Sequence, residues 1–270
     1  MLFGAYPDPI AFRVGAFGIH WYAILILIGA SAGTWVAVYC ARVKNIASVL
    51  VWDFVLIVTP VLIICGRLAY VLSHLGQYPS FASALRIWEG GMSIHGAIGG
   101  AILTAIIFAR MRKISVWTLL DVIFPGAAIA YAIGRWGNYF NQEVFGPSTD
   151  VSWGVPIDVF HRPVQYIGSM YFHPTWLYES LWSLVIFFCL FFLFTKLSKI
   201  PGVVSALYMM LYYTGRFGLE FLRLDSVYLF GQVTATHMVS VVAILLGAVV
   251  LYFRLHVLRK QATADITRDG

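Results

Sequence analysis

The residue that most directly suggests chemistry is His95, which stands at the start of an apolar run that continues to Ala109. It lies in the segment WEGGMSIHGAIGG, residues 88–100, where few other side chains are polar. A titratable ring inside a membrane span is costly and is seldom kept without a use. Imidazole titrates near neutral pH, so His95 is a candidate general base. The alternative is a histidine that ties helices together through hydrogen bonds.

A second polar group lies in GRWGNYFNQEVFG, residues 134–146, where Arg135, Asn138 and Glu143 stand among aromatic residues. The guanidinium of arginine is a planar fork that makes bidentate bonds to phosphate oxygens. Arg135 is therefore a candidate phosphate ligand. The plainer interpretation is a helix end with an arginine and a tryptophan at the membrane interface, but the density of amide and carboxyl groups favours a site.

Arg216 and Glu220 stand four residues apart, so on a helix they share one face and can pair. The pair is either a structural ion pair or a device that holds an arginine in position for a phosphate, and the sequence leaves both open. Glu143 and Glu179 either orient a base, bind substrate hydroxyls or pair with Arg67 or Arg135.

Composition restricts the class of protein to integral membrane proteins. Of the 270 residues, 60% are hydrophobic and only 11% are charged, against about 25% charged residues in soluble domains. The apolar runs are long enough for membrane helices, and the short alternating segments of a membrane β-barrel are absent from the sequence. The three cysteines lie in apolar runs, and no CxxC or HExxH spacing occurs, so neither a disulfide nor a metal site is expected.

The fold class that follows is an all-α integral membrane protein of one domain, residues 1–270. Seven transmembrane helices are expected, with a small outward-facing cap over 135–174 that is rich in Gly, Pro and aromatic residues. No cleavable signal peptide is expected, because no basic region precedes the first span. The predicted spans are 19–41, 49–72, 91–109, 116–134, 175–195, 202–222 and 234–255.

Lysine and arginine concentrate in the connections 42–48, 110–115 and 196–201 and after residue 255. Positive loops face the cytoplasm, so the N-terminus is expected outside and the C-terminus inside. The net charge of +6 is thereby explained by topology, and no nucleic-acid partner is expected. With this orientation, polar side chains of six helices gather at the depth of the outer leaflet: Tyr22, Arg67, Tyr70, His95, Arg135, Asn138, Tyr178, Glu179, Arg216 and Glu220. Asp53 and Asp121, at the inner ends, are interpreted as groups between helices.

The segments 88–100 and 134–146, together with HPTWLYES at 173–180 and RFGLEFLR at 216–223, resemble the signature segments of the bacterial prolipoprotein diacylglyceryl transferase family. HWY at 20–22 and GRLAYVL at 66–72 resemble it as well, and the matches follow the family's order over nearly the whole chain. One departure is visible: after residue 232 the family usually continues with a serine and a proline, which 233–237 lacks. That departure concerns the local shape of the entrance to the last helix and not the chemistry.

The resemblance implies an enzyme of the bacterial cytoplasmic membrane that moves the diacylglyceryl group of phosphatidylglycerol onto the lipobox cysteine of a prolipoprotein. A thioether would form and glycerol phosphate would leave, as the first step of lipoprotein maturation, without a metal or an organic cofactor. The implied catalytic residues are His95, Arg135 and Arg216. The implied phosphatidylglycerol-binding residues are Tyr22, Arg67, Arg135, Asn138, Glu143, Arg216 and Glu220.

Other classes of membrane protein account less well for these residues. An anion transporter is the main alternative, since arginines in a bundle bind anions, but it would more often show inverted repeats and broken helices near the midplane. The last span contains no lysine for the Schiff base of a retinal-type receptor. The sequence also contains no GxSG element, which a rhomboid-like protease would need. A purely structural membrane protein would not need the polar cluster.

Overall fold

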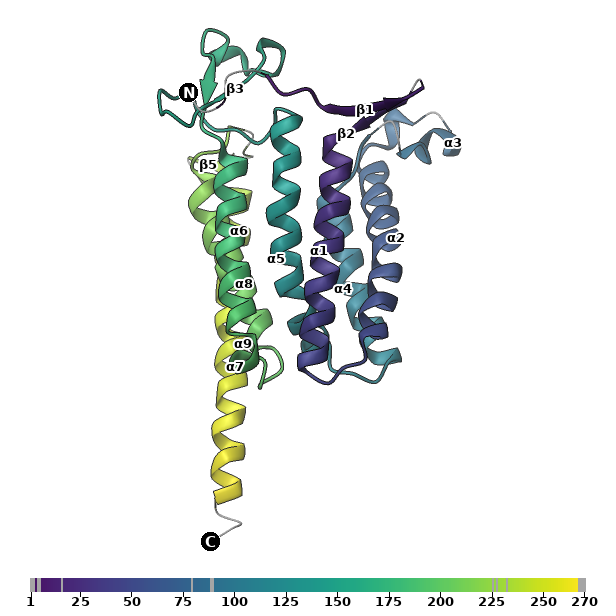
Figure 1. Cartoon of the computed structure of the whole chain (residues 1–270), viewed down its shortest axis with the longest axis vertical. Coiled ribbons are helices and arrows are strands. Elements are labelled where there is room, and N and C mark those ends of the chain that lie inside the picture. Colours follow the sequence, from purple (N-terminus) through teal and green to yellow (C-terminus); the bar gives the residue numbers. More distant parts are fainter. Residues whose placement is uncertain are drawn as a thin grey trace.

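The computed structural model describes residues 3, 6–15, 17–78, 80–87, 90–224, 226, 228–231 and 233–266. Long helices run side by side and form a bundle, with short strands and turns gathered at the end where the N-terminus lies (Figure 1). Among the described residues, six helices are long and apolar enough to cross a membrane. The expectation of an all-α, multi-pass membrane protein is confirmed.

The predicted spans coincide with seven helices. They are α1 (Trp21–Val43), α2 (Ser48–Ser73), α4 (Ile94–Met111), α5 (Val116–Phe140), α6 (Thr175–Phe192), α8 (Val203–Glu220) and α9 (Ala235–Ile266). The helix that falls outside the six is α8, which carries Arg216 and Glu220. Its crossing of the membrane therefore stays a prediction.

Helix α5 continues to Phe140, six residues beyond the predicted end at 134, so Arg135 and Asn138 lie on a helix and not in the cap. The glycines of this segment suggested a helix end, but Gly137 serves a close approach. A Cβ at position 137 would lie 2.5 Å from Cδ2 of Tyr22 on α1. The glycine thus lets the start of α1 pack against the end of α5, and the predicted cap boundary at 135 is wrong.

Helix α4 begins at Ile94, with Ser93 as the N-cap residue whose side chain accepts a hydrogen bond from the N–H of Gly96. His95 is therefore in the first turn, not one turn inside a span that starts at 91. Helix α9 is longer than predicted and extends to Ile266, beyond the predicted end at 255. Its last turns project past the other helices (Figure 1).

Short elements complete the end of the bundle that carries the N-terminus. Strands β1 (Ile10–Val14) and β2 (Phe17–His20) form an antiparallel hairpin before α1. The connection after α2 contains η1 (Leu75–Gln77) and α3 (Phe81–Ala84). The cap holds β3 (Val155–Pro156) paired with β4 (Tyr171–Phe172), together with η3 (Val159–His161) and η4 (Val164–Tyr166). Strand β5 (Tyr228–Phe230) pairs with β6 (Val233–Thr234) before α9. At the opposite end of the bundle, a short helix, α7 (Phe194–Leu197), follows α6 (Figure 1).

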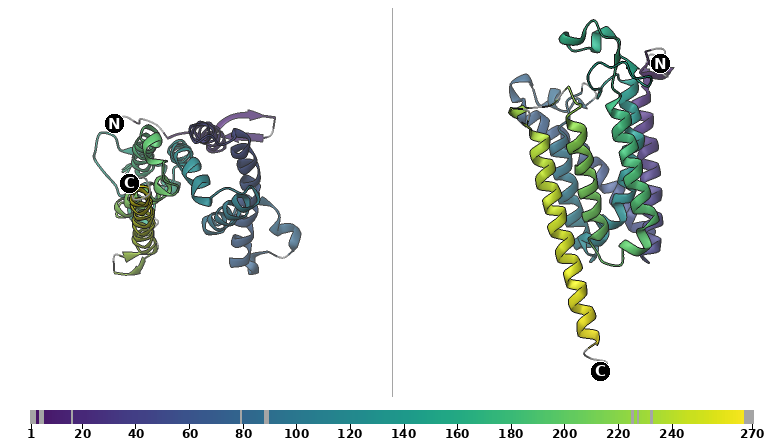
Figure 2. Two further views of the ribbon diagram at one scale, coloured as in Figure 1. Left: turned by 90° about the horizontal axis from the view of Figure 1, so that it is seen from below. Right: turned by 90° about the vertical axis from the view of Figure 1, so that its left-hand side faces the viewer.

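Small residues bring the helices together. A Cβ on Gly126 of α5 would lie 2.2 Å from the carbonyl oxygen of Gly33 on α1, so these backbones touch. On α4, Gly96 and Gly100 both meet Cys65 of α2, whereas nothing lies within 4 Å of a Cβ placed on Gly99. Close approach through small residues is the usual basis of helix association in lipid. Seen along the bundle, α8 and α9 lie on one side and α2 and α4 on the other (Figure 2).

The packing is apolar at both ends of the bundle. A core cluster at the end where α1 passes to α2 includes Cys40, Val51, Val122 and Phe194. A second cluster, formed by Val155, Ile157, Phe172 and Trp176, joins the cap to the start of α6. The polar side chains described next lie near the end of α5, the start of α6 and the end of α8.

Candidate active site

Glu179, in the second turn of α6, is the centre of a buried network of charged side chains. Its carboxylate Oε1 lies 2.8 Å from Nη1 of Arg216 and 3.1 Å from Nη1 of Arg223, and its Oε2 lies 2.6 Å from Nη2 of Arg135. The hydroxyl of Tyr131 also donates to Oε2, at 2.8 Å. The side chain of Glu179 is 2% exposed. One carboxylate therefore fixes guanidinium groups from α5, from α8 and from the segment after α8.

Arg216 links Glu179 to a second buried carboxylate. Its Nη2 donates to Oε2 of Glu220 at 2.8 Å, across one helical turn. Oε1 of Glu220 accepts from the hydroxyls of Ser226, at 2.8 Å, and Thr234, at 3.0 Å. The expected pair of Arg216 and Glu220 is present, and it is one part of a larger network.

Arg135 links Glu179 to Asn138 and, through Asn138, to Glu143 in the segment after α5. Its Nη1 donates to Oδ1 of Asn138 at 3.1 Å, and Nδ2 of Asn138 donates to Oε1 of Glu143 at 2.7 Å. Asn138 is buried, whereas Glu143 is exposed. Tyr22, packed on Gly137, is close enough to interact electrostatically with Glu143 and Arg135. The structure thus brings together Tyr22 and all of the predicted residues of segment 134–146.

Two arginines of this network, Arg135 and Arg216, have N–H groups that make no bond to other described residues. Arginine has five N–H donors. In bonds to other described residues, Arg216 uses Nη1 and Nη2 once each, and Nε of Arg135 is buried without a partner. Buried donors are normally satisfied, and guanidinium donors suit phosphate oxygens. Arg135 and Arg216 therefore retain N–H groups of the kind that binds phosphate oxygens.

Arg67 lies apart from this network, on α2, and is only 5% exposed. Its guanidinium donates to backbone carbonyls of the segment between α2 and α4, with Nε 2.8 Å from the oxygen of Ala84 and Nη1 3.0 Å from that of Gly91. Further bonds reach Ser83, Arg86 and Gly90. Its donors are thus directed at this segment, not at the other predicted site residues.

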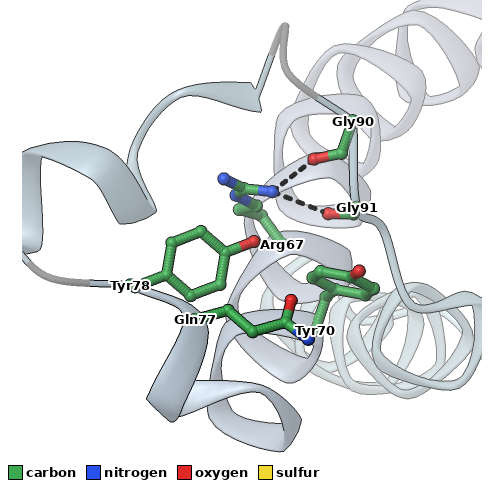
Figure 3. Close-up of a pocket in the computed structure, with 6 residues that line it drawn as sticks. All are labelled: Arg67, Tyr70, Gln77, Tyr78, Gly90 and Gly91. Atoms are coloured by element: carbon green, nitrogen blue, oxygen red, sulfur yellow. Dashed lines mark hydrogen bonds between the residues drawn. The ribbon is translucent and has the colours of Figure 1, made fainter.

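A pocket of about 200 Å³ lies beside Arg67. It is lined by Arg67, Tyr70, Gln77, Tyr78, Gly90 and Gly91, and the arginine points at the two glycine carbonyls (Figure 3). The ring of Tyr78 lies 5.1 Å from the guanidinium carbon. The pocket therefore belongs to the loop that follows α2, and Arg67 shapes it.

His95 is exposed and has no hydrogen-bond or ion-pair partner among the described residues. Its neighbour Gly96 faces α2, so the first turn of α4 is held against α2 while the imidazole remains available. The structure does not connect His95 to the Glu179 network. The hydrogen bonds expected of a histidine that only ties helices together are not found within the described part of the chain.

Sequence reasoning left Glu179 among several carboxylates with open roles, and it missed Tyr131, Arg223 and Thr234 as partners. The available signal for Glu179 was a carboxylate close to the start of an apolar helix, where an ionisable group is expected to have a partner. The side-chain distances were needed to identify Arg135, Arg216 and Arg223 as the partners of Glu179.

Comparison with known proteins identifies the family. The family model described as prolipoprotein diacylglyceryl transferase matches residues 9–253. The chain is 40% identical to a phosphatidylglycerol–prolipoprotein diacylglyceryl transferase of Synechococcus elongatus, covering 98% of this chain and 92% of the relative. It is 37% identical to the protein of that name from Bacillus velezensis, with 92% of each chain covered. The Thermotoga maritima protein of that name is 41% identical over 87% of this chain and 81% of its own length. The chain therefore belongs to the prolipoprotein diacylglyceryl transferase family.

Proposed function

We propose that this protein transfers the diacylglyceryl group of phosphatidylglycerol to the lipobox cysteine of a prolipoprotein. The observation that carries the proposal is the convergence of Arg135 and Arg216 on the buried carboxylate of Glu179 in a member of this family. Phosphatidylglycerol carries a phosphodiester, and arginines held in fixed positions suit its oxygens. Membrane lipids would surround the bundle and supply the donor.

The reaction exchanges one bond at a glycerol carbon. The cysteine sulfur forms a C–S bond with the glycerol carbon that carries the phosphodiester, and the C–O bond to phosphate breaks. The electron pair of the broken bond remains on the phosphate oxygen, and glycerol phosphate leaves with the proton that balances the thiol. Negative charge develops on this leaving oxygen. Arg135 and Arg216 stabilise that charge, because their positions are set before the reaction by Glu179 and Glu220.

His95 is the proposed base for the substrate thiol, because the thiolate is the nucleophile and an imidazole titrates near neutral pH. Its exposure and lack of a partner among described residues support this role. A second arrangement is consistent with the same residues: His95 shapes the pocket while an arginine assists deprotonation. With His95 as the base, the thiol must approach from the side of α4.

The remaining predicted residues bind the donor or support those that do. Asn138 and Glu143 orient Arg135 from the cap side, and Tyr22 supplies a hydroxyl beside them. Arg67 contributes indirectly, because it holds the segment between α2 and α4 through backbone carbonyls. With the N-terminus outside, all these residues lie near the outer leaflet of the cytoplasmic membrane.

The experiment that tests the proposal is a transfer assay in vesicles. Purified protein is reconstituted with phosphatidylglycerol, a lipobox peptide is added, and the mass of the peptide is measured. We expect a gain of one diacylglyceryl group that is lost when the peptide cysteine is replaced by serine. Vesicles of phosphatidylcholine alone are the lipid control. No gain with folded protein and a working relative in parallel would favour an anion transporter or an inactive family member.

A further inference from the structure

Helix α9 starts with an unusual capping arrangement. The side-chain oxygen of Thr234 accepts a hydrogen bond from the backbone N–H of His237 at 3.2 Å, and Nδ1 of His237 accepts from the backbone N–H of Thr234, also at 3.2 Å. This reciprocal pattern is a capping box, in which the third helical residue is ordinarily Glu or Gln. Here a histidine takes that position, so an imidazole nitrogen fixes the residue that precedes the helix.

The capped residue also touches the active-site network. The hydroxyl of Thr234 donates to Oε1 of Glu220 at 3.0 Å, and Oε2 of Glu220 accepts from Arg216 at 2.8 Å. A hydroxyl has one hydrogen, so a hydroxyl that donates to Glu220 cannot also donate to Nδ1. The donor to Nδ1 of His237 is then the backbone N–H of Thr234. The capping box therefore determines where the hydroxyl of Thr234 points.

This chain of contacts is shielded from solvent. Thr234 is 1% exposed, Glu220 3% and His237 5%. The imidazole packs against the rings of Phe217 and Phe221, with centroids 4.9 and 4.5 Å away. Helices α8 and α9 lie side by side along their length (Figure 2). A change at His237 is therefore transmitted to Glu220 through one buried side chain and not through water.

The tautomer follows from the same contacts. Because Nδ1 accepts a hydrogen bond, the ring proton of the neutral imidazole is on Nε2, which has no partner within the described residues. A protonated ring would place a second donor against the N–H of Thr234 and a positive charge at a helix N-terminus, where cations are disfavoured. The acceptor at Nδ1 is thus the functional feature of this side chain.

We propose that His237 is a positioning residue for the transfer reaction: its Nδ1 holds Thr234, which orients Glu220 and thereby Arg216. The inference rests on the proposed role of Arg216 at the phosphate. Small displacements of a reacting group are costly, so loss of the acceptor should lower kcat by between about tenfold and a hundredfold. Binding of phosphatidylglycerol, and hence KM, should change little, because Arg135 and the cap are untouched.

The test compares His237→Leu, which removes the acceptor, with His237→Gln, whose amide oxygen is a usual acceptor in a capping box. Both are measured in the vesicle assay. We expect His237→Leu to lose kcat with KM retained and His237→Gln to restore kcat to within about twofold of the wild type. Thr234→Val removes the hydroxyl that connects His237 to Glu220, so it should reproduce the effect of His237→Leu. Ser240→Ala, one turn farther along α9, is the matched buried control and should match the wild type.

The possible failures are distinguishable. Absence of transfer by the wild type, or full transfer by Arg216→Lys, would remove the proposed role of Arg216 before His237 is considered. If those two proteins behave as expected, wild-type kcat in His237→Leu overturns the inference. An equal loss in His237→Gln overturns it as well, since ring packing and not the acceptor would then matter. If His237→Leu does not fold, Thr234→Val and His237→Gln still decide the outcome.

Discussion

At the scale of single residues, Glu179 organises the site. Its two carboxylate oxygens contact the hydroxyl of Tyr131 and the guanidinium groups of Arg135, Arg216 and Arg223. Removing one partner from a buried ion pair leaves an uncompensated charge and costs more than the pair itself contributes. The residues proposed to meet the phosphate therefore depend on a carboxylate that need not touch the substrate.

Glu179→Gln should be strongly destabilising, by about 3–5 kcal/mol, because the buried arginines lose their shared counter-charge while the side-chain shape is kept. Thermal unfolding of the purified protein in detergent measures the effect. Glu143→Gln is the control, since Glu143 is exposed and its loss should cost no more than about 1 kcal/mol. Equal melting temperatures for the two variants would contradict the central role of Glu179.

His95→Gln should lower kcat by at least about a hundredfold if His95 is the general base. A general base accepts a proton in the rate-determining step, so its loss should also change the pH dependence of transfer. The measurement is a pH–rate profile of transfer. His256→Gln, an exposed histidine on α9, is the control. A profile of unchanged shape in His95→Gln would assign deprotonation of the thiol to another group.

At the scale of secondary-structure elements, backbone contacts between helices position the site. Helix α5 carries Arg135 and Asn138, and it packs most extensively on α1 through Gly33 and Gly126. At the opposite end of α5, Asp121 accepts from the N–H groups of Gly202 and Ser205, at 2.7 and 2.8 Å, and so caps the start of α8. Both helices that bear the arginines proposed to meet the phosphate are thus anchored away from the site.

The contact between α1 and α5 yields a prediction about packing. Gly126→Ala places a methyl group 2.2 Å from the carbonyl oxygen of Gly33, so the helices must separate, at a cost of about 1–3 kcal/mol. Gly99→Ala on α4 is the matched control, because nothing lies within 4 Å of the new methyl group. Melting temperatures in detergent compare the two. A Gly126→Ala variant as stable as Gly99→Ala would show that the two backbones are not in contact.

Buried groups at this end also interact with Lys44, which follows α1. Its Nζ donates to the carbonyl oxygen of Ser198 at 2.5 Å. Burial lowers the pKa of the Lys44 ammonium, and the nearby charge of Asp121 opposes that effect. Lys44 therefore links the end of α1 to the turn before α8, and its ammonium is close enough to Asp121 on α5 to interact with it electrostatically. Asp121, expected to act between helices, does so.

At the scale of the whole molecule, orientation in the membrane is the property on which the proposed reaction depends. Thiol, lipid and site meet only if the cap faces outward. The exposed residues Phe160, in η3, and Met111, at the end of α4, mark opposite ends of the bundle. The bias of lysine and arginine toward one set of connections predicts the orientation, since positive loops remain in the cytoplasm.

Labelling with a membrane-impermeant maleimide tests the orientation in intact spheroplasts, with the native cysteines replaced by alanine. Phe160→Cys should react without permeabilisation, and Met111→Cys only after it, because the reagent cannot cross the bilayer. Retention of transfer activity shows that each variant is folded. Labelling of Met111→Cys alone in intact spheroplasts would reverse the topology and place the Glu179 network at the cytoplasmic face.

The sequence by itself determined the class of protein, the approximate positions of the helices and the segments that hold the polar site. Hydropathy suffices for this, because lipid requires about twenty apolar residues per span and penalises each ionisable group within one. The resemblance of the polar segments added the family. Arg216, Glu220, Arg135 and Asn138 could all be selected in this way, since each is a polar residue near the end of an apolar run.

Only the tertiary structure decided which of these side chains meet. Hydropathy reports transfer into lipid and says nothing about the distance between two helices. The sequence therefore left the pairing of Glu179 with Arg135 as one of several alternatives and did not indicate its pairing with Arg216. The partners of Arg67 were also not available from the sequence, because they are backbone carbonyls, which every residue type has. The sequence predicted the end of the fourth span at residue 134, but α5 continues to Phe140, and Gly137 within this extension admits the ring of Tyr22. Contacts between elements, and not local preference, set the geometry of the site.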